Sequence, residues 1–223
     1  MPEFSFDDLE FRRATPDDFD TIVEFTNTVF IAQEPLCQAM GFSRADGNAI
    51  FGWIVAHSLK FPYTVLVFDR RSGDLVGYRV TSVWFRREED NHFDPLPAQT
   101  VKSEDMGAIL DQLKKSFWDL CPKEVNAVLR RELSCVRGDF QRRGIASRMA
   151  EEFIDAEELK AKGIGGIVSE TSSTANQALL TKKGFKPLKE VVYGAQVDTD
   201  GSRIVPTELH DGATKLVLNF KQF

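Results

Sequence analysis

The chain has 223 residues, of which 42% are hydrophobic and 28% are charged. This composition excludes a disordered or a fibrous chain, and the length suffices for one domain, residues 1–223, with a sizeable core. The formal net charge of −6 disfavours a nucleic-acid-binding protein and suits a cationic small molecule.

Several other classes are excluded by simple features of the sequence. No apolar run approaches the length that spans a bilayer, and the acidic N-terminus has no signal-peptide pattern, so we expect a cytoplasmic protein without a membrane partner. The cysteines and histidines show neither disulfide nor metal-ligand spacing: Cys37, Cys121, Cys135, His57, His92 and His210.

The N-terminal part predicts a short strand followed by a helix. Residues 9–14 alternate as a strand does, and Thr15 and Pro16 form a typical helix start. An apolar stripe then continues to residue 30. The helix should end near Glu34, because Pro35 disfavours helical geometry in the residue before it.

The middle of the chain predicts a helix, a hairpin and a second helix. Residues 41–60 have helical spacing, and residues 63–68 and 75–85 flank a turn. The polar residues 86–101 read as a loop. Ser103 is then predicted to cap a helix that ends before Pro122.

Residues 125–136 are predicted to form one strand, with five side chains on one face: Val125, Ala127, Leu129, Leu133 and Cys135. After a tight turn, Gly144 opens a helical pattern that should continue to Gly163. Its shared face is formed by Ile145, Met149, Phe153 and Ala156.

The remaining elements are a buried strand at residues 164–169, a helix that ends at Gly184, and an antiparallel pair at residues 185–197 and 214–220. A whole helix separates the strand ending at Val136 from the one starting at Ile164, so these two should be parallel. The order predicts a mixed α/β (α+β) sheet flanked by helices.

The turn before Gly144 has the properties of a phosphate site. A helix N-terminus leaves backbone N–H groups unpaired, and glycine lets a ligand approach the backbone closely. Arg142, Arg143 and Arg148 crowd this helix start, where the dipole disfavours cations, and a bound polyanion would explain them. The same local pattern also fits a solvated, charged turn.

Three segments carry a family resemblance: residues 141–146 read Gln-Arg-Arg-Gly-Ile-Ala, residues 176–185 end in Gly-Phe, and residues 34–36 read Glu-Pro-Leu. They resemble motifs of the GNAT acetyltransferase superfamily, and of invertebrate arylalkylamine N-acetyltransferases in particular. Residues 141–146 (Gln-Arg-Arg-Gly-Ile-Ala) look like the Gln/Arg-x-x-Gly-x-Gly/Ala loop that holds the acetyl-CoA pyrophosphate in that family. Residues 176–185 resemble its second cofactor-side helix with a terminal Gly-Phe, and residues 34–36 its Glu-Pro-Leu. The resemblance implies a single GNAT domain, with about seven strands in a mostly antiparallel sheet and a parallel pair at the cofactor site.

The resemblance also implies direct transfer of an acetyl group from acetyl-CoA to a primary amine, with no metal. It implies that Glu34 is the general base, acting through water, and that Ser172 helps to bind or to relay protons. Release of the thiolate would depend on Ser172, on water, or on no acid at all. Backbone N–H of Cys135 or Val136 would stabilise the oxyanion. The expected cofactor-binding residues are Ser134, Cys135, Val136, Gln141, Arg142, Arg143, Gly144, Ile145, Ala146, Ser147 and Asn176.

One position departs from the family pattern. Many GNAT enzymes place a tyrosine general acid before the Gly-Phe, whereas here that position resembles Leu180, which cannot donate a proton. The sequence leaves open whether the acceptor is an arylalkylamine, a polyamine, an amino acid or a protein N-terminus, and whether the protein is a monomer or a homodimer. A non-catalytic acyl-CoA-binding module also remains possible.

Overall fold

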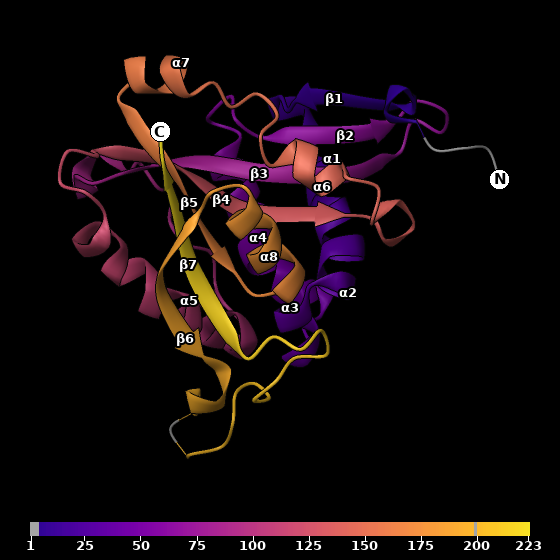
Figure 1. Cartoon of the computed structure of the whole chain (residues 1–223). Coiled ribbons are helices and arrows are strands. Elements are labelled where there is room, and N and C mark those ends of the chain that lie inside the picture. Colours follow the sequence, from indigo (N-terminus) through magenta and orange to yellow (C-terminus); the bar gives the residue numbers. More distant parts are fainter. Residues whose placement is uncertain (1–4, 199) are drawn as a thin grey trace.

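The computed structural model describes residues 5–198 and 200–223. They contain a seven-stranded sheet with the order β1-β2-β3-β4-β5-β7-β6 (Figure 1). Within the described residues only β4 and β5 pair in parallel, and every other neighbouring pair is antiparallel. The strands are β1 (Leu9–Arg13), β2 (Val65–Asp69), β3 (Leu75–Phe85), β4 (Ala127–Val136), β5 (Ile164–Thr171), β6 (Lys186–Val192) and β7 (Lys215–Gln222).

Helices cover both faces of the sheet. The α-helices are α1 (Phe19–Phe25), α2 (Ile31–Gln33), α3 (Pro35–Ala39), α4 (Arg44–Ser58), α5 (Val101–Leu120), α6 (Ile145–Met149), α7 (Ala156–Ala161) and α8 (Thr174–Lys182). The core of one face packs against α1, α4 and α5, and we name it the α4 face. The cores of the other face, the α6 face, pack against α6, α7 and α8.

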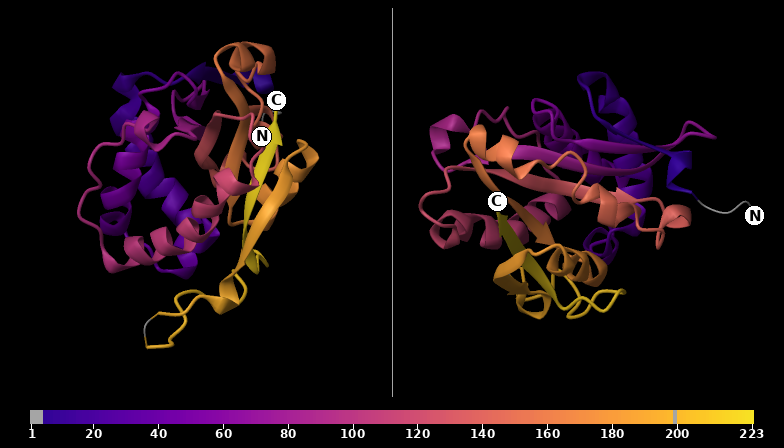
Figure 2. Two further views of the ribbon diagram at one scale, coloured as in Figure 1. Left: turned by 90° about the vertical axis from the view of Figure 1, so that its left-hand side faces the viewer. Right: turned by 45° about the horizontal axis from the view of Figure 1, so that its top comes forward.

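The views in the figures agree with these two layers. In the left view of Figure 2, the helices of the N-terminal half lie together on one side of the sheet, and the described residues between β6 and β7, 193–198 and 200–214, project below it. The predicted mixed α/β sheet of about seven strands, with a parallel pair at the fourth and fifth strands, is therefore confirmed.

The helix that follows β1 ends where the sequence predicts. After α1, a π-helical turn at Thr26–Phe30 leads into α2, which ends at Gln33. Glu34 is extended, with φ −76° and ψ 121°, as expected for a residue before proline. The chain then forms the short helix α3, which the sequence analysis did not predict.

The start of α5 differs from the prediction. Thr100, not Ser103, is the N-cap, and its hydroxyl accepts the backbone N–H of Ser103. Ser103 is the third residue of the helix and completes a capping box by accepting the backbone N–H of Thr100 at 2.8 Å. Both threonine and serine are common N-cap residues, so the sequence alone does not distinguish Thr100 from Ser103, and the capping box uses both.

Strand β4 contains one more residue than the matching stretch of β3. Leu133 pairs with Val80, but Arg131 pairs with the next residue, Thr81. Glu132 is therefore the extra residue of a β-bulge, which breaks the alternation of side chains between the two faces.

The prediction that five residues of this strand share one face is wrong for this reason. Leu133 and Cys135, which follow the bulge, pack in the core of the α4 face. Val125 packs there too, but it lies before β4 begins and so outside the alternation of the strand. Ala127 and Leu129, which precede the bulge, pack in a core of the α6 face. A sequence pattern with period two cannot reveal the inserted residue.

The single helix predicted between Gly144 and Gly163 is in fact two short helices, α6 and α7. Phe153, expected on the buried face, lies in the turn between them with φ +57° and is 37% exposed. Asp155 starts α7, because its carboxylate accepts the backbone N–H groups of Glu157 and Glu158.

A buried arginine stabilises the end of α6. The fully buried Arg79 of β3 donates from Nη1 to the carbonyl of Met149 at 2.5 Å and from Nη2 to that of Glu152 at 3.1 Å. The carbonyls at a helix end have no partner within the helix, so this side chain supplies one. The sequence gives no local sign of this contact, because the partners lie about 70 residues apart.

None of the helices in the described part of the chain combines the length and the apolar character needed to cross a lipid bilayer.

Asp46 connects the beginnings of two helices and generates a pH-dependent prediction. Its carboxylate accepts the backbone N–H and the hydroxyl of Ser43 and the hydroxyl of Thr100, which lowers its pKa to about 2. A folded pKa below the unfolded value of 3.8 stabilises the folded state above that pH, and the gain is lost as pH falls towards 2.

We therefore expect Asp46→Asn to lower the free energy of unfolding by about 1 kcal/mol at pH 7, after screening by solvent. The difference from the unmodified protein should shrink between pH 4 and pH 2, as measured by urea unfolding. The exposed Asp119→Asn is the control, with no expected change. A loss that stays constant down to low pH would contradict this account.

Candidate active site

Strands β4 and β5 separate at one end, and the candidate site lies in the gap. Their pairing runs from Ala127 with Ile164 to Arg131 with Ser169. Beyond that point β4 continues to Val136 and β5 to Thr171, and within the described residues no pairing joins these two ends. One edge of β4 is therefore open after the bulge at Glu132.

The register identifies which backbone groups face the gap. Arg137 donates its backbone N–H to the carbonyl of Val76. In an antiparallel ladder alternate residues point to the same partner, so the backbone groups of Cys135 face β3 and those of Ser134 and Val136 face the gap. Of the two donors predicted for an oxyanion, the register favours Val136 over Cys135.

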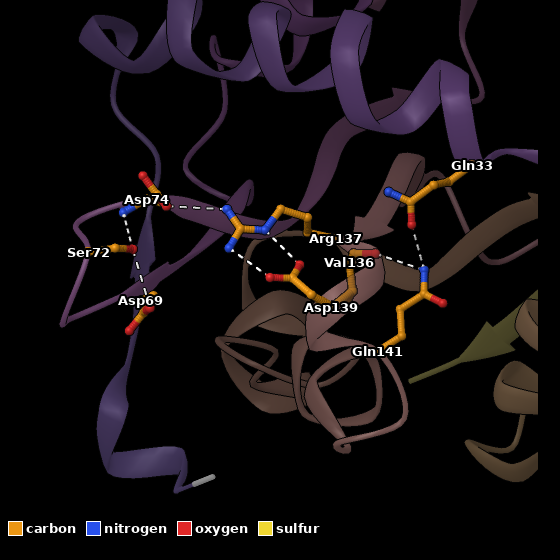
Figure 3. A network of polar contacts seen from close by, with 8 residues as sticks. All are labelled: Gln33, Asp69, Ser72, Asp74, Val136, Arg137, Asp139 and Gln141. Carbon is orange, nitrogen blue, oxygen red and sulfur yellow. Dashed lines mark hydrogen bonds and ion pairs between the residues drawn. The ribbon is translucent and has the colours of Figure 1, made fainter. Parts of the chain in front are cut away.

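The loop after β4 is held by polar contacts (Figure 3). The Arg137 guanidinium contacts the carboxylates of Asp74 and Asp139, at 3.3 and 2.8 Å. Gln141 donates from Nε2 to the carbonyl of Val136 at 2.9 Å and to Oε1 of Gln33 at 2.8 Å. Gln33 precedes Glu34, so this contact joins the loop at residues 141–146, which we name the glycine loop, to the end of α2.

The loop itself presents backbone donors. Arg142 and Gly144 have positive φ, 61° and 82°, and both are exposed. Among the hydrogen bonds of the described residues, none has as its donor the backbone N–H of Arg142 or Gly144, or the first three N–H groups of α6, those of Ile145, Ala146 and Ser147. Unpaired N–H groups in a left-handed turn can bind an anion such as a phosphate.

Glu34 lies at the helix break on the other side of the gap. It is the N-cap of α3, and its Oε2 accepts the backbone N–H of Cys37 at 2.6 Å. Its Oε1 accepts the hydroxyl of Ser172 at 2.5 Å. Ser172 follows β5, so the fold brings together the two predicted catalytic residues from positions 138 residues apart.

Tyr193 belongs to the same group, although the sequence analysis did not single it out. Its buried hydroxyl donates to the backbone carbonyl of Ser172 at 3.2 Å. Burial raises its pKa, and the charges of Glu34 and Asp211 raise it further. The sequence analysis placed Tyr193 within a strand at residues 185–197, where a tyrosine carries no local signal of this role, whereas β6 ends at Val192.

The predicted residues of α8 lie in different surroundings. Leu180, at the position where a tyrosine acid is common in the resembling family, is fully buried in an apolar cluster. Asn176 lies in the first turn of α8, half-buried, with its backbone N–H donated to Ser173 Oγ. Its proposed contact with the cofactor stays a prediction.

Two aromatic residues of α4 lie in different surroundings. Phe51 is 4% exposed and belongs to the core of the α4 face. Trp53 stacks on His57 and Phe93 instead, beside a hollow of about 460 Å³ that Val83 helps to line. Val83 pairs with Leu129, at the closed end of the sheet, so this hollow is separate from the gap.

The described residues contain no group of three or more His, Cys, Asp or Glu side chains arranged to hold a metal ion.

A mixed seven-stranded sheet with one parallel pair that separates beside a glycine loop defines the GNAT acetyltransferase fold. No family model matches the sequence, and no curated protein sequence matches it. Solved structures do match.

Three of these structures cover nearly the whole chain. Arylalkylamine N-acetyltransferase 2 from Aedes aegypti has 17% identity and a TM-score of 0.75, over 96% of this chain and 98% of that one. Mosquito arylalkylamine N-acetyltransferase like 5b has 14% identity and a TM-score of 0.76, over 96% and 100%. The Drosophila melanogaster polyamine N-acetyltransferase that forms N-acetylagmatine has 14% identity and a TM-score of 0.73, over 97% and 100%. The fold implied by the sequence resemblance is thus confirmed.

The cysteines near the site are unsuited to act as nucleophiles. Burial and the charge of Glu34 raise the pKa of Cys135 to about 12 and that of Cys37 well above its usual range. Burial likewise raises the pKa of Cys121 to about 11. A thiol must be deprotonated to attack, so none of the three is activated near neutral pH.

We therefore expect the native protein at pH 8 to react slowly with a thiol reagent, and the urea-unfolded protein to titrate three thiols rapidly. The measurement is the time course of reagent consumption in both states. Rapid modification of Cys135 in the native protein would contradict this interpretation and would favour an acetyl-enzyme.

Proposed function

We propose that the chain is an acetyl-CoA-dependent N-acetyltransferase that acetylates a primary amine, most closely of the arylalkylamine type. The observation that carries the proposal is the Glu34–Ser172 pair, which the fold places at the gap between β4 and β5. Sequence resemblance and solved structures of the same fold support it.

The residues around the gap suit acetyl-CoA. The pyrophosphate would bind the unpaired N–H groups of the loop at Arg142 and Gly144 and at the start of α6. The amide-rich arm of the cofactor would extend along the open edge of β4, at Ser134 and Val136. The thioester would then reach the side of the gap where Glu34 lies.

The chemistry requires few groups. A protonated amine must lose a proton before it attacks, and Glu34 is the proposed acceptor of that proton, oriented by the hydroxyl of Ser172. The backbone N–H of Val136 would stabilise the oxyanion that forms on the thioester carbonyl. Because the nearby cysteines are not activated, transfer is direct within a ternary complex.

The proposal does not fix which amine accepts the acetyl group. The solved structures of this fold include enzymes named for arylalkylamines and one that forms N-acetylagmatine, so a polyamine-like acceptor is the main alternative. An amino acid, a protein N-terminus and a non-catalytic acyl-CoA-binding role are further alternatives. A cytoplasmic location, the absence of nucleic-acid and membrane partners, and a monomeric or homodimeric state stay predictions of the sequence.

The test of the base is turnover of acetyl-CoA, followed as free thiol, across tryptamine-like, dopamine-like, polyamine and amino-acid acceptors. Glu34→Gln should lower kcat by about 10²–10⁴-fold with the best amine, because the proton acceptor is lost.

Glu24→Gln is the matched control, since Glu24 is an exposed glutamate of α1 paired with Arg44. It should leave turnover unchanged. Acetyl-CoA binding without turnover of any amine would contradict the enzymatic proposal and favour the binding module.

The test of the cofactor site compares two glycines with the same strained backbone. Gly144 has φ +82° in the loop, whereas Gly163 has φ +79° in open surroundings and precedes Ile164, which pairs with Ala127 at the closed end of the sheet. Alanine at either should cost about 1 kcal/mol of stability. Only Gly144→Ala should weaken acetyl-CoA binding, by about tenfold in calorimetry, because the added methyl group keeps phosphate oxygens from the backbone. Equal affinities of the two variants would place the pyrophosphate elsewhere.

A further inference from the structure

Arg131 is a buried cation at the point where β4 and β5 separate. It forms the last pair of the parallel ladder, with Ser169, and directly precedes the bulge at Glu132. Arg131 is only 3% exposed. No hydrogen bond or ion pair of the described residues includes its side chain, and its Nε and Nη1 are enclosed without a partner.

Two neighbouring arginines, the half-buried Arg130 and the buried Arg79, have partners. Arg130 donates to Glu170 at 3.1 Å, and its Nε lies 3.5 Å from a carboxylate oxygen of Glu132. Arg79 donates to backbone carbonyls at the end of α6. Burial lowers the pKa of Arg131 to about 10, with no carboxylate to oppose the shift. A buried charge without a partner is costly, and its retention calls for a function.

The register places Arg131 on the α6 face, where the cofactor would bind. Arg131 is opposite Thr81, and residues opposite each other in an antiparallel pair point to the same face. Thr81 accepts a hydrogen bond from Nε of Arg79, whose guanidinium reaches α6. Ser134, opposite Arg79, lies on this face too.

A polar strip separates the two apolar cores of the α6 face. One core contains Val76, Val136 and Met149 near the glycine loop. The other contains Val83 and Leu129 near the closed end of the sheet. Arg79, Thr81 and Arg131 lie between them on β3 and β4. The strip therefore crosses the sheet at the base of the gap.

We propose that Arg131 stabilises the thiolate of coenzyme A as it leaves, in place of a general acid. This inference rests on the proposed function. The amine nitrogen bonds to the thioester carbon, the C–S bond breaks, and its electron pair stays on sulfur. The protonated amine loses two protons in all. Glu34 accepts the first before the attack and passes it to water, and then accepts the second from the nitrogen that has bonded to carbon. Neither proton goes to sulfur.

The surroundings explain why a cation takes this role. Leu180, at the position of a tyrosine acid in the resembling family, cannot donate a proton and is fully buried. A thiol is acidic enough to leave as an anion if a positive charge is close. The charged group that faces Arg131 from β3 is Arg79, which is itself influenced by Glu152 and Arg13. Two guanidinium groups therefore favour an anion here.

The experiment compares binding of coenzyme A and desulfo-coenzyme A, which lacks the thiol, by calorimetry from pH 6 to pH 10. All other titrations cancel in the ratio of the two dissociation constants. If Arg131 lowers the pKa of the bound thiol by one unit, the preference for coenzyme A should rise about tenfold with pH. Arg131→Met should abolish the rise, and Arg131→Lys should keep part of it. The exposed Arg71→Met controls for net charge.

The outcomes separate the two proposals. If neither compound binds the unmodified protein, the proposed function fails and this inference with it. If both bind with a ratio independent of pH, or if Arg131→Met keeps the rise, this inference alone is overturned. Arg131→Met should also melt at a higher temperature, because it removes an unpaired buried charge. A lower melting temperature or failure to fold would show a structural role and overturn the proposal.

Discussion

The extra residue in β4 is the constraint on which the rest of the site depends. Glu132 interrupts the alternation of the strand just where the pairing with β5 ends. Its carboxylate accepts the hydroxyl of Ser82 on β3 at 2.7 Å, which fixes the bulge. Arg130 bridges to Glu170 on β5 and holds the two strands together at the last point before they separate. The gap between β4 and β5 is therefore closed by side-chain contacts at one end and open at the other.

The bulge also determines to which face of the sheet the side chains on either side of it point. Without it, Cys135 and Arg131 would point to the same face, because they are four residues apart. With it, Cys135 lies on the α4 face, near Glu34, and Arg131 on the α6 face. The proposed base and the proposed stabiliser of the leaving group thus approach the thioester from opposite faces of the sheet.

Local signals in the sequence predicted most helices and strands, and two features of the site. The helix break at Glu34 follows from Pro35, and the turn at Gly144 follows from its residue types. The sequence could not predict the bulge at Glu132 or the contact between Arg79 and α6, because both depend on partners distant in the chain. The hydrogen bond between Glu34 and Ser172 was not predicted, since no local pattern encodes a contact between residues 138 positions apart.

The most direct measurement is amide hydrogen exchange by NMR, with and without coenzyme A. If the gap is the cofactor site, the ligand should protect the N–H groups of Ser134 and Val136, which face the gap, and those of the loop near Gly144. The N–H of Cys135 should not change, because it already faces β3. Protection that excludes β4, or that affects Cys135 without its neighbours, would contradict the account.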